Sequence, residues 1–146
     1  MNCLLSVLQS PLSGTGVFAK RNFSKDEITL KLNLNTPALS LPTRYSIQLG
    51  KNYHIEDKEI IFVNHSCESN CFLDFECLGL KALRKIKKGE EITFNYLTTE
   101  FKMHSPFICH CSSLNCFGEI RGFKFLSKEK QKLLFCNLSP FLRSTV

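Results

Sequence analysis

The sequence predicts a mainly β fold with few short helices, and two observations support this prediction. Short segments that alternate apolar and polar residues recur along the chain, with Gly, Pro and Asn between them. Only one segment, near the C-terminus, has the pattern of a helix. With 146 residues, a hydrophobic fraction of 43% and only 7 Gly and 5 Pro, the chain is suited to a single compact domain with its own core.

The expected strands of the first half follow one another closely. Residues 1–35 contain short strands, because "GTG" at 14–16 interrupts an alternating pattern that resumes as "VFAKRNF", and "SKDE" then leads into "ITLKLNL". Pro37 and Pro42 mark a loop before "YSIQLG", which alternates again. The run "KEIIFV" at 58–63 is apolar enough to predict a buried strand.

The second half continues the pattern up to a cysteine-rich loop. "CFLDFECLGLKALRKI" predicts two strands joined near Glu76 or Gly79, and "KKGEE" is a turn that leads into "ITFNYL". Residues 107–118 have no period and predict a loop ordered by a metal. Ser127 precedes "KEKQKLLF" and is the expected N-cap of a short helix.

No segment approaches the ~18 consecutive apolar residues of a membrane-spanning helix. The N-terminal segment "MNCLLSVLQSPL" lacks the basic start and the small-residue cleavage site of a signal peptide. We therefore expect a cytoplasmic or nuclear protein. Export as an effector through a system that uses no such signal remains open.

The net charge of +6 does not identify a partner by itself. A basic cluster alternates with apolar residues and precedes a glycine, so we interpret it as the solvated face of a strand and turn rather than a nucleic-acid site. Contact with nucleic acid stays open, but no motif supports it. The cluster consists of Lys81, Arg84, Lys85, Lys87 and Lys88.

Cysteine usage indicates a metal rather than disulfides. Cys109, Cys111 and Cys116 form a C-x-C-x4-C cluster, and in a chain without a secretory signal such clustering favours metal binding. Three thiolates leave a tetrahedral zinc ion one ligand short. Four cysteines are scattered and are expected to be small buried side chains. They are Cys3, Cys71, Cys77 and Cys136.

Three further motifs have unremarkable interpretations when each is taken alone. The "GTG" turn lacks the G-x-G-x-x-G pattern of a dinucleotide site. Asn64 and His65, in "NHSCESNC", could cap the open hydrogen bonds of a strand end. Phe94 and Tyr96, in "EEITFNY", are expected on the same face of a strand, where core packing would explain them.

Taken together, "GTGVFA", "FVNHSCESNC", "KKGEEITFNY" and "CHCSSLNCFGEIRGF" resemble the SET-domain protein-lysine methyltransferases with a post-SET zinc loop. The likeness runs from about residue 10 to residue 126. The family's cysteine-rich pre-SET segment is absent, so the chain is similar to the minimal SET proteins common in bacteria. The implied fold is one of small curved sheets with a knot-like C-terminal crossing. Its expected parts are a SET domain at 1–98, a post-SET zinc loop at 99–126 and a short C-terminal helix or tail at 127–146.

The resemblance implies S-adenosylmethionine as cofactor. Asn64 and His65 would contact its adenine end, the glycine turn would hold its methionine end, and Tyr45 matches an aromatic residue that faces it. The positions that match the family's cofactor contacts are Ser13, Gly14, Thr15, Gly16, Tyr45, Asn64 and His65.

The resemblance also implies the catalytic residues, with Tyr45 counted beside them. Tyr96 matches the tyrosine that orients a neutral lysine amine toward the sulfonium methyl group. Phe94 matches the family's Phe/Tyr switch, where phenylalanine favours higher methylation. The substrate would be a lysine in a histone-like tail or in another protein.

The resemblance completes the zinc site with Cys67, so that Cys67, Cys109, Cys111 and Cys116 hold one structural zinc ion. Cys71 is the alternative fourth ligand. His104 and His110 are weaker alternatives.

The chain departs from the family pattern at several positions, which bear on substrate choice more than on the chemistry. Phe117 or Phe123 is expected to close the lysine channel in place of a missing tryptophan. The departing positions are Asn95 for the usual aspartate, Ile61 for arginine, Ser112 for glycine and Glu119 for that tryptophan.

Two alternatives come from other functional classes. One is a catalytically degenerate SET module that binds a peptide or partner, which a cofactor-binding titration would distinguish. The other is a zinc-ribbon protein that binds nucleic acid, but it would need a second complete ligand set and a basic face with stacking aromatics. The sequence shows neither.

Overall fold

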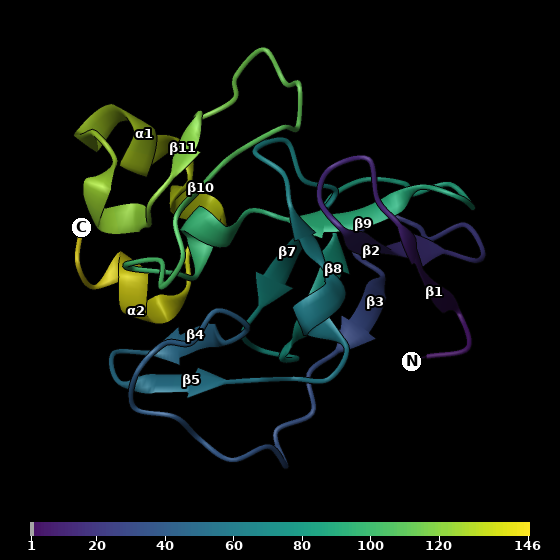
Figure 1. The fold of residues 1–146 in the computed structure, drawn as a ribbon, viewed down its shortest axis with the longest axis horizontal. Helices are drawn as coiled ribbons and strands as arrows, with labels where there is room; N and C mark the ends of the chain where they lie inside the picture. Colours follow the sequence, from purple (N-terminus) through teal and green to yellow (C-terminus); the bar gives the residue numbers. More distant parts are fainter. Residues whose placement is uncertain (1) are drawn as a thin grey trace.

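The computed structural model describes residues 2–146, and Figure 1 shows a mostly β molecule with its two labelled α-helices near the C-terminus. Short strands form wherever the sequence alternates. The strands are β1 Leu5–Gln9, β2 Thr15–Ala19, β3 Ile28–Lys31, β4 Ile47–Gly50, β5 Tyr53–Ile55, β6 Asn64–His65, β7 Cys71–Asp74, β8 Gly79–Ala82, β9 Glu91–Phe94, β10 Phe107–Ile108 and β11 Glu119–Ile120.

The helices are few and short, and no helix among the described residues is long and apolar enough to cross a membrane. Ser127 caps the first α-helix as predicted, because its side chain accepts a hydrogen bond from the Lys130 amide. A second α-helix follows, which the sequence did not indicate. The α-helices are α1 Lys128–Leu133 and α2 Pro140–Arg143, and the 3-10 helices are η1 Ile60–Phe62, η2 Tyr96–Thr98, η3 Phe123–Phe125 and η4 Phe135–Asn137.

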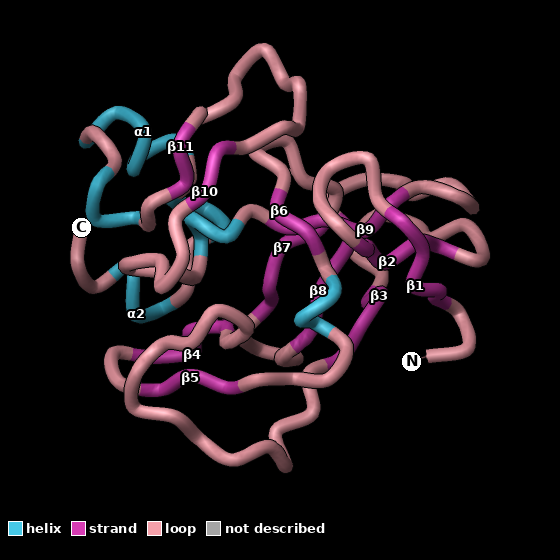
Figure 2. The backbone as a smooth tube through the Cα atoms, viewed as in Figure 1, coloured by secondary structure: helices cyan, strands magenta, loops and turns pink. Residues whose placement is uncertain are grey.

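One curled sheet of seven strands organises the molecule, in the order β1-β2-β9-β7-β8-β3 with β6 joined to β9. Two smaller sheets, β4-β5 and β10-β11, flank it (Figure 2). The β7 and β8 strands form the predicted pair, with Asp74 opposite Gly79 next to the connecting turn. A mainly β fold with few short helices is therefore confirmed.

The pairing of β6 with β9 brings two of the sequence motifs together. These strands run parallel, with Asn64 opposite Thr93 and His65 opposite Phe94. "NHSC" and "EEITFNY", separated by more than twenty residues in sequence, thus lie side by side at the centre of the sheet.

Two hydrophobic clusters stabilise the fold. The larger one fills the curl of the main sheet and includes Val17, Leu80 and Ile92, none of which is exposed to solvent. The smaller one lies at the C-terminal end, where Phe123 and Leu142 are enclosed by α1, η4 and α2. A hydrogen bond of 2.8 Å from the Ser139 amide to the Thr98 carbonyl joins the C-terminal helices to the segment after β9.

Two sequence predictions, one about the segment "KEIIFV" and one about the burial of scattered cysteines, were wrong. "KEIIFV" does not form a buried strand, because Ile60–Phe62 is a 3-10 helix in which Ile61 and Phe62 are more than a third exposed. The carboxylate of Asp57 accepts hydrogen bonds from the Glu59 and Ile60 amides, which turns the chain before a strand can begin. Cys3 and Cys136 are exposed rather than buried.

We expect Gly122→Ala to destabilise the protein more than Gly89→Ala does. Gly122 has φ +118° and ψ 160°, a conformation essentially confined to glycine, and an added Cβ would lie 2.7 Å from the Cα of Lys102. Gly89 also has a positive φ of +90°, but an added Cβ meets nothing within 4 Å. Urea unfolding should show a loss of roughly 3 kcal/mol or more for Gly122→Ala and about 1 kcal/mol for Gly89→Ala. Equal losses would contradict the steric argument.

Candidate functional site

Two cavities meet at one tyrosine. The larger has a volume of about 560 Å³ and lies between the turn before β2, strand β6 and residues 103–110. The smaller has a volume of about 60 Å³ and is lined by residues 43–47, Ile60, Ile61, Phe94 and Glu100. Both cavities share four lining residues, which are Arg44, Tyr96, Met103 and Ser105.

The side chain of Asn64 holds the glycine turn in place. Its amide nitrogen donates to the Ser13 carbonyl at 3.1 Å, to the Thr15 carbonyl at 2.9 Å and to Glu91 Oε1 at 2.8 Å. A Cβ at Gly16 would lie 2.1 Å from that same Glu91 oxygen, so any larger residue there would displace the Glu91 carboxylate. Asn64 therefore shapes one wall of the larger cavity through contacts within the protein.

His65 connects the tyrosine to the cysteine cluster. The imidazole is 5% exposed, its Nδ1 accepts a hydrogen bond of 3.1 Å from the Tyr96 amide, and its Nε2 lies 3.3 Å from Cys67 Sγ. Burial lowers the pKa of His65 to about 4, so the ring is neutral at physiological pH. A neutral ring with Nδ1 as acceptor carries its proton on Nε2 and donates it toward the sulfur.

The Tyr96 side chain is half-buried where the cavities meet. Its hydroxyl donates a hydrogen bond of 2.6 Å to the Val63 carbonyl, which leaves the oxygen free to accept a bond from the cavity side. Burial, and then the charges of Glu100 and Glu91, raise the pKa of Tyr96, so the hydroxyl stays protonated. The prediction that Tyr96 and Phe94 share a strand face is wrong, because β9 ends at Phe94 and Tyr96 lies in the 3-10 helix that follows. The two rings still pack with centroids 4.9 Å apart.

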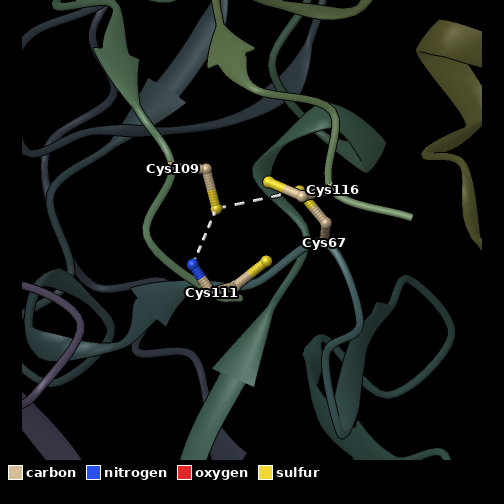
Figure 3. Close-up of side chains that lie close together, drawn as sticks. All are labelled: Cys67, Cys109, Cys111 and Cys116. Atoms are coloured by element: carbon tan, nitrogen blue, oxygen red, sulfur yellow. Dashed lines mark hydrogen bonds between the residues drawn. The ribbon is translucent and has the colours of Figure 1, made fainter. Parts of the chain in front are cut away.

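Four thiols converge beside this site (Figure 3). The sulfur atoms of Cys67, Cys109, Cys111 and Cys116 all lie within 4.8 Å of one another. Cys67 Sγ is 3.8 Å from both Cys109 Sγ and Cys116 Sγ. A tetrahedral zinc ion with Zn–S bonds of about 2.3 Å requires sulfur atoms about 3.8 Å apart, whereas a disulfide requires about 2.05 Å. The cluster could therefore hold a zinc ion.

The environment of the thiols differs across the cluster. Burial raises the pKa of Cys67 above its ordinary value and that of Cys109 to about 11. Burial also opposes the thiolate of Cys111, but backbone hydrogen bonds from Ser113 and Cys67 outweigh it and lower the pKa to about 7. Cys111 is thus the first of these three thiols to lose its proton. A cation at the centre would draw off the remaining protons.

The structure places the alternative metal ligands away from the cluster. Cys71 is fully buried in the main core, where its sulfur lies 3.7 Å from Thr29 Oγ1. His104 is exposed and contacts Ser105, and His110 lies between two of the clustered cysteines without joining them. The four clustered thiols are those that the resemblance implied.

The remaining predicted site residues divide between the two cavities. Ser13, Asn64 and His65 line the larger one, and the turn that contains Gly14, Thr15 and Gly16 adjoins it. Tyr45 is largely exposed and lines only the smaller cavity, so its predicted approach to the cofactor gains no support. The catalytic and cofactor roles of these residues stay predictions.

Several residues that line the site were not predicted from the sequence. Phe107 lines the larger cavity, and its ring packs against His65 and Tyr96 at centroid distances of 5.7 and 6.0 Å. Neither Phe117 nor Phe123, which were expected to close the lysine channel, lines the smaller cavity. Phe123 is buried in the smaller core. Glu100 is a buried carboxylate in the smaller cavity. Its one sequence signal is that Glu100 is the only charged residue in "LTTEF", the segment that follows "TFNY".

Comparisons with known proteins identify a family for this chain. The chain matches the SET domain family over residues 14–97. It is 36% identical over 92 residues to Methyltransferase flvH of Aspergillus flavus, covering 60% of this chain and 52% of that protein. It is 30% identical over 141 residues to the "Histone-lysine N-methyltransferase, H3 lysine-36 specific" of Candida albicans, covering 81% of this chain and 17% of that protein.

A solved structure shows the same fold. The crystal structure of KRYPTONITE in complex with mCHG DNA and SAH matches with a TM-score of 0.56 and 20% identity, over 79% of this chain and 28% of that chain. This chain spans about half the length of flvH, or 52%, and smaller shares of the longer relatives. The relatives named here are fungal, so the likeness to minimal bacterial proteins stays a prediction. Because the matched segment covers more than half of the chain, this chain belongs to the SET-domain family.

Proposed function

We propose that this chain is an S-adenosylmethionine-dependent protein-lysine methyltransferase. The observation that carries the proposal is the position of Tyr96 in the walls of both cavities, where a bound cofactor and a lysine side chain would meet. The relatives named as methyltransferases and as histone-lysine N-methyltransferases support the same reaction. The structural neighbour was solved with SAH.

The larger cavity suits a nucleoside-sized molecule. Its volume of about 560 Å³ lies within the ~300–1,000 Å³ typical of cofactor sites. It combines an aromatic wall, Phe107, with polar groups from Ser13 and His65. When bound there, S-adenosylmethionine supplies an electrophilic methyl group on a positively charged sulfur. The protein would contribute orientation and exclusion of water.

The smaller cavity suits the end of a lysine side chain. Ile60, Ile61 and Phe94 give it apolar walls, and such walls disfavour the charged ammonium form relative to the neutral amine. The Tyr96 oxygen, whose own proton is directed to the Val63 carbonyl, can accept a hydrogen bond from the amine N–H. That contact would turn the nitrogen lone pair toward the larger cavity, and such orientation accounts for a large share of catalytic rate gains.

The zinc ion belongs to the same proposal as a structural element. One ion held by the four clustered cysteines would fasten the loop between β10 and β11 to the end of β6. Since residues 106–110 line the larger cavity, fixing this loop would complete the cofactor site. The substrate is a protein lysine, in a histone-like tail or in another protein.

Transfer of labelled methyl groups from S-adenosylmethionine to purified histones and to fractionated cell proteins tests the proposal. Labelled lysine in a protein band supports it. Tight cofactor binding without transfer to any protein would instead favour a degenerate SET module that binds a partner. Failure to bind the cofactor would overturn the proposal.

We expect Tyr96→Phe to retain cofactor binding and lose most methyl transfer, because it removes the oxygen that orients the amine. General considerations of orientation suggest a loss of about 10²-fold in kcat. Removing the hydroxyl also leaves the Val63 carbonyl unpaired, so thermal unfolding must be measured beside activity. A folded variant with the parent rate would show that Tyr96 has no catalytic role.

Phe94→Tyr should shift the product toward monomethyllysine without abolishing activity. Phe94 lines the smaller cavity beside Tyr96, and it carries no hydroxyl that could hold an amine or a water in one orientation. A new hydrogen bond of ~1 kcal/mol would change the ratio of successive methylation steps about fivefold. Mass spectrometry of a methylated peptide over time measures this ratio. If the parent enzyme stops at one methyl group under excess cofactor, another wall residue controls the product.

Purified protein should contain one zinc ion per chain, and Cys67→Ser should lower that content after treatment with a chelator. Serine replaces a soft thiolate with a poor zinc ligand. Cys136→Ser is the matched control, because Cys136 is exposed and lies outside the cluster. Elemental analysis gives the result. Stoichiometric, tightly held zinc in Cys67→Ser would rule out Cys67 as a ligand.

A further inference from the structure

A buried carboxylate of the smaller cavity has no part in the function proposed above. Glu100 follows η2 and is 6% exposed. Its backbone is fixed on both sides, since its amide donates to the Tyr96 carbonyl at 2.9 Å and its carbonyl accepts from the Phe123 amide at 2.9 Å. The residue is thus held rigidly beside the tyrosine at which the cavities meet.

The two carboxylate oxygens of Glu100 have different surroundings. Oε1 accepts hydrogen bonds from the Gln48 amide at 2.8 Å and from Thr99 Oγ1 at 3.0 Å. Oε2 has no hydrogen-bond partner among the described residues. Among the described residues, only His54 Nδ1 is a fully buried polar side-chain atom without a hydrogen-bond partner. Since Oε2 also has no partner, it must be accessible to solvent. Oε2 therefore borders open space, and the space that Glu100 lines is the smaller cavity.

The hydrogen bonds that Glu100 forms within the protein use only one of its two carboxylate oxygens, Oε1. A glutamine would accept the same two bonds through its amide oxygen, so the negative charge must be explained by something else. Burial raises the pKa of Glu100 to about 7, and the carboxylate forms no ion pair within the described residues. Its charge reaches the Tyr96 hydroxyl, whose pKa it helps to raise. The titratable or charged residues that line the same cavity are Arg44, Tyr45 and Tyr96. On η3, the Lys124 ammonium lies 5.8 Å from the ring centroid of Phe101, the residue after Glu100.

The reaction needs a base at this place. Free lysine has a pKa of about 10.4 and arrives as an ammonium ion, which has no lone pair for attack. Tyr96 stays protonated, with its proton directed to the Val63 carbonyl. Both nitrogens of His65 are engaged, with the Tyr96 amide and with Cys67. Glu100 is the one carboxylate among the described residues that line the smaller cavity.

We propose that Glu100 is a catalytic residue that receives, at Oε2, the proton of the substrate lysine ammonium. This inference rests on the proposed methyltransferase function. One N–H bond of the ammonium breaks, its electron pair stays on nitrogen, and an O–H bond forms on Oε2. The neutral amine then has the lone pair that Tyr96 orients, and the protonated carboxyl no longer attracts an ammonium ion.

The first test compares Glu100→Gln with the parent enzyme across pH. Glutamine keeps the contacts of Oε1 but cannot take a proton. We expect kcat/KM of the parent enzyme to fall as pH drops below about 7, where the carboxylate becomes protonated. In Glu100→Gln, kcat near pH 8 should fall by about 10²-fold or more. Its rate should keep rising toward pH ~10, because only free amine formed in solution can react.

Glu90→Gln is the matched control, because Glu90 pairs with Arg84 at the surface and lies outside both cavities. It should leave the pH profile unchanged. Thermal unfolding and cofactor binding should be the same in Glu100→Gln as in the parent. An unchanged rate and profile in a folded Glu100→Gln protein would overturn the inference.

The second test needs neither a variant nor methyl transfer. Nα-acetyl-lysine amide is titrated into the parent protein, saturated with S-adenosylhomocysteine, by calorimetry in buffers of different ionisation enthalpy. At pH 8 the proton should pass to Glu100, so almost none is released to buffer. At pH 6 Glu100 already holds a proton, given a pKa of about 7, so about one should be released.

The outcomes separate the inference from the function on which it rests. Equal proton release at both pH values, or no binding of the lysine amide at millimolar concentrations, would overturn the role of Glu100 even if methyl transfer is found. The expected change in proton release without transfer to any protein would show that Glu100 and the lysine nitrogen hold one proton between them, as the inference requires, and would count against the proposed reaction. The expected change in proton release together with methyl transfer to a protein would support both the role of Glu100 and the proposed function.

Discussion

The parallel pairing of β6 with β9 is the contact on which the rest of the site depends. The β6 strand has only two residues, Asn64 and His65, and so short a strand has little stability of its own. Its side chains make up for this. Asn64 fastens the glycine turn to Glu91 on β9, and His65 reaches from the Tyr96 amide to Cys67. One short strand thus connects the walls of the larger cavity, the central tyrosine and the thiol cluster.

This arrangement uses up nearly every polar group near the centre. The Asn64 amide, both His65 nitrogens and the Tyr96 proton all have partners inside the protein. Two acceptors remain directed at open space, namely the Tyr96 oxygen and Glu100 Oε2. Acceptors that face a narrow cavity can take hydrogen bonds from a ligand that carries N–H groups. An amine bearing protons is such a ligand.

The strands could be predicted from the sequence where the apolar and polar pattern decides the local structure, but not where a specific polar contact decides it. Alternation predicted the strands at 15–19, 28–31 and 91–94, although each of them buries consecutive residues. The apolar run at 58–63 gave a wrong prediction, because the Asp57 carboxylate accepts a hydrogen bond from the Ile60 amide and residues 60–62 form a 3-10 helix. Apolar composition carries no information about such a competing polar contact.

The candidate site divides in the same way. The cysteine spacing indicated three metal ligands, but only the likeness to a family indicated Cys67, which lies 42 residues before Cys109 in sequence. Phe107 gave no signal because an isolated aromatic next to a proline has no period. Glu100 gave little, since its environment depends on Gln48, 52 residues away, and on the fold of the C-terminal segment.

The C-terminal helices explain why that carboxylate is so firmly held. The Phe123 amide, at the edge of the smaller core, donates to the Glu100 carbonyl, and the Ser139 amide donates to the Thr98 carbonyl two residues earlier. Gln48 closes the arrangement from the other side, because its backbone amide donates to Glu100 Oε1 and its side-chain oxygen accepts from the Phe101 amide. The segment after Tyr96 is therefore anchored to β4 and to the C-terminal helices at once. The proposed role of Glu100 as a proton acceptor requires a rigidly held side chain, and elements on both sides of it in the sequence supply that rigidity.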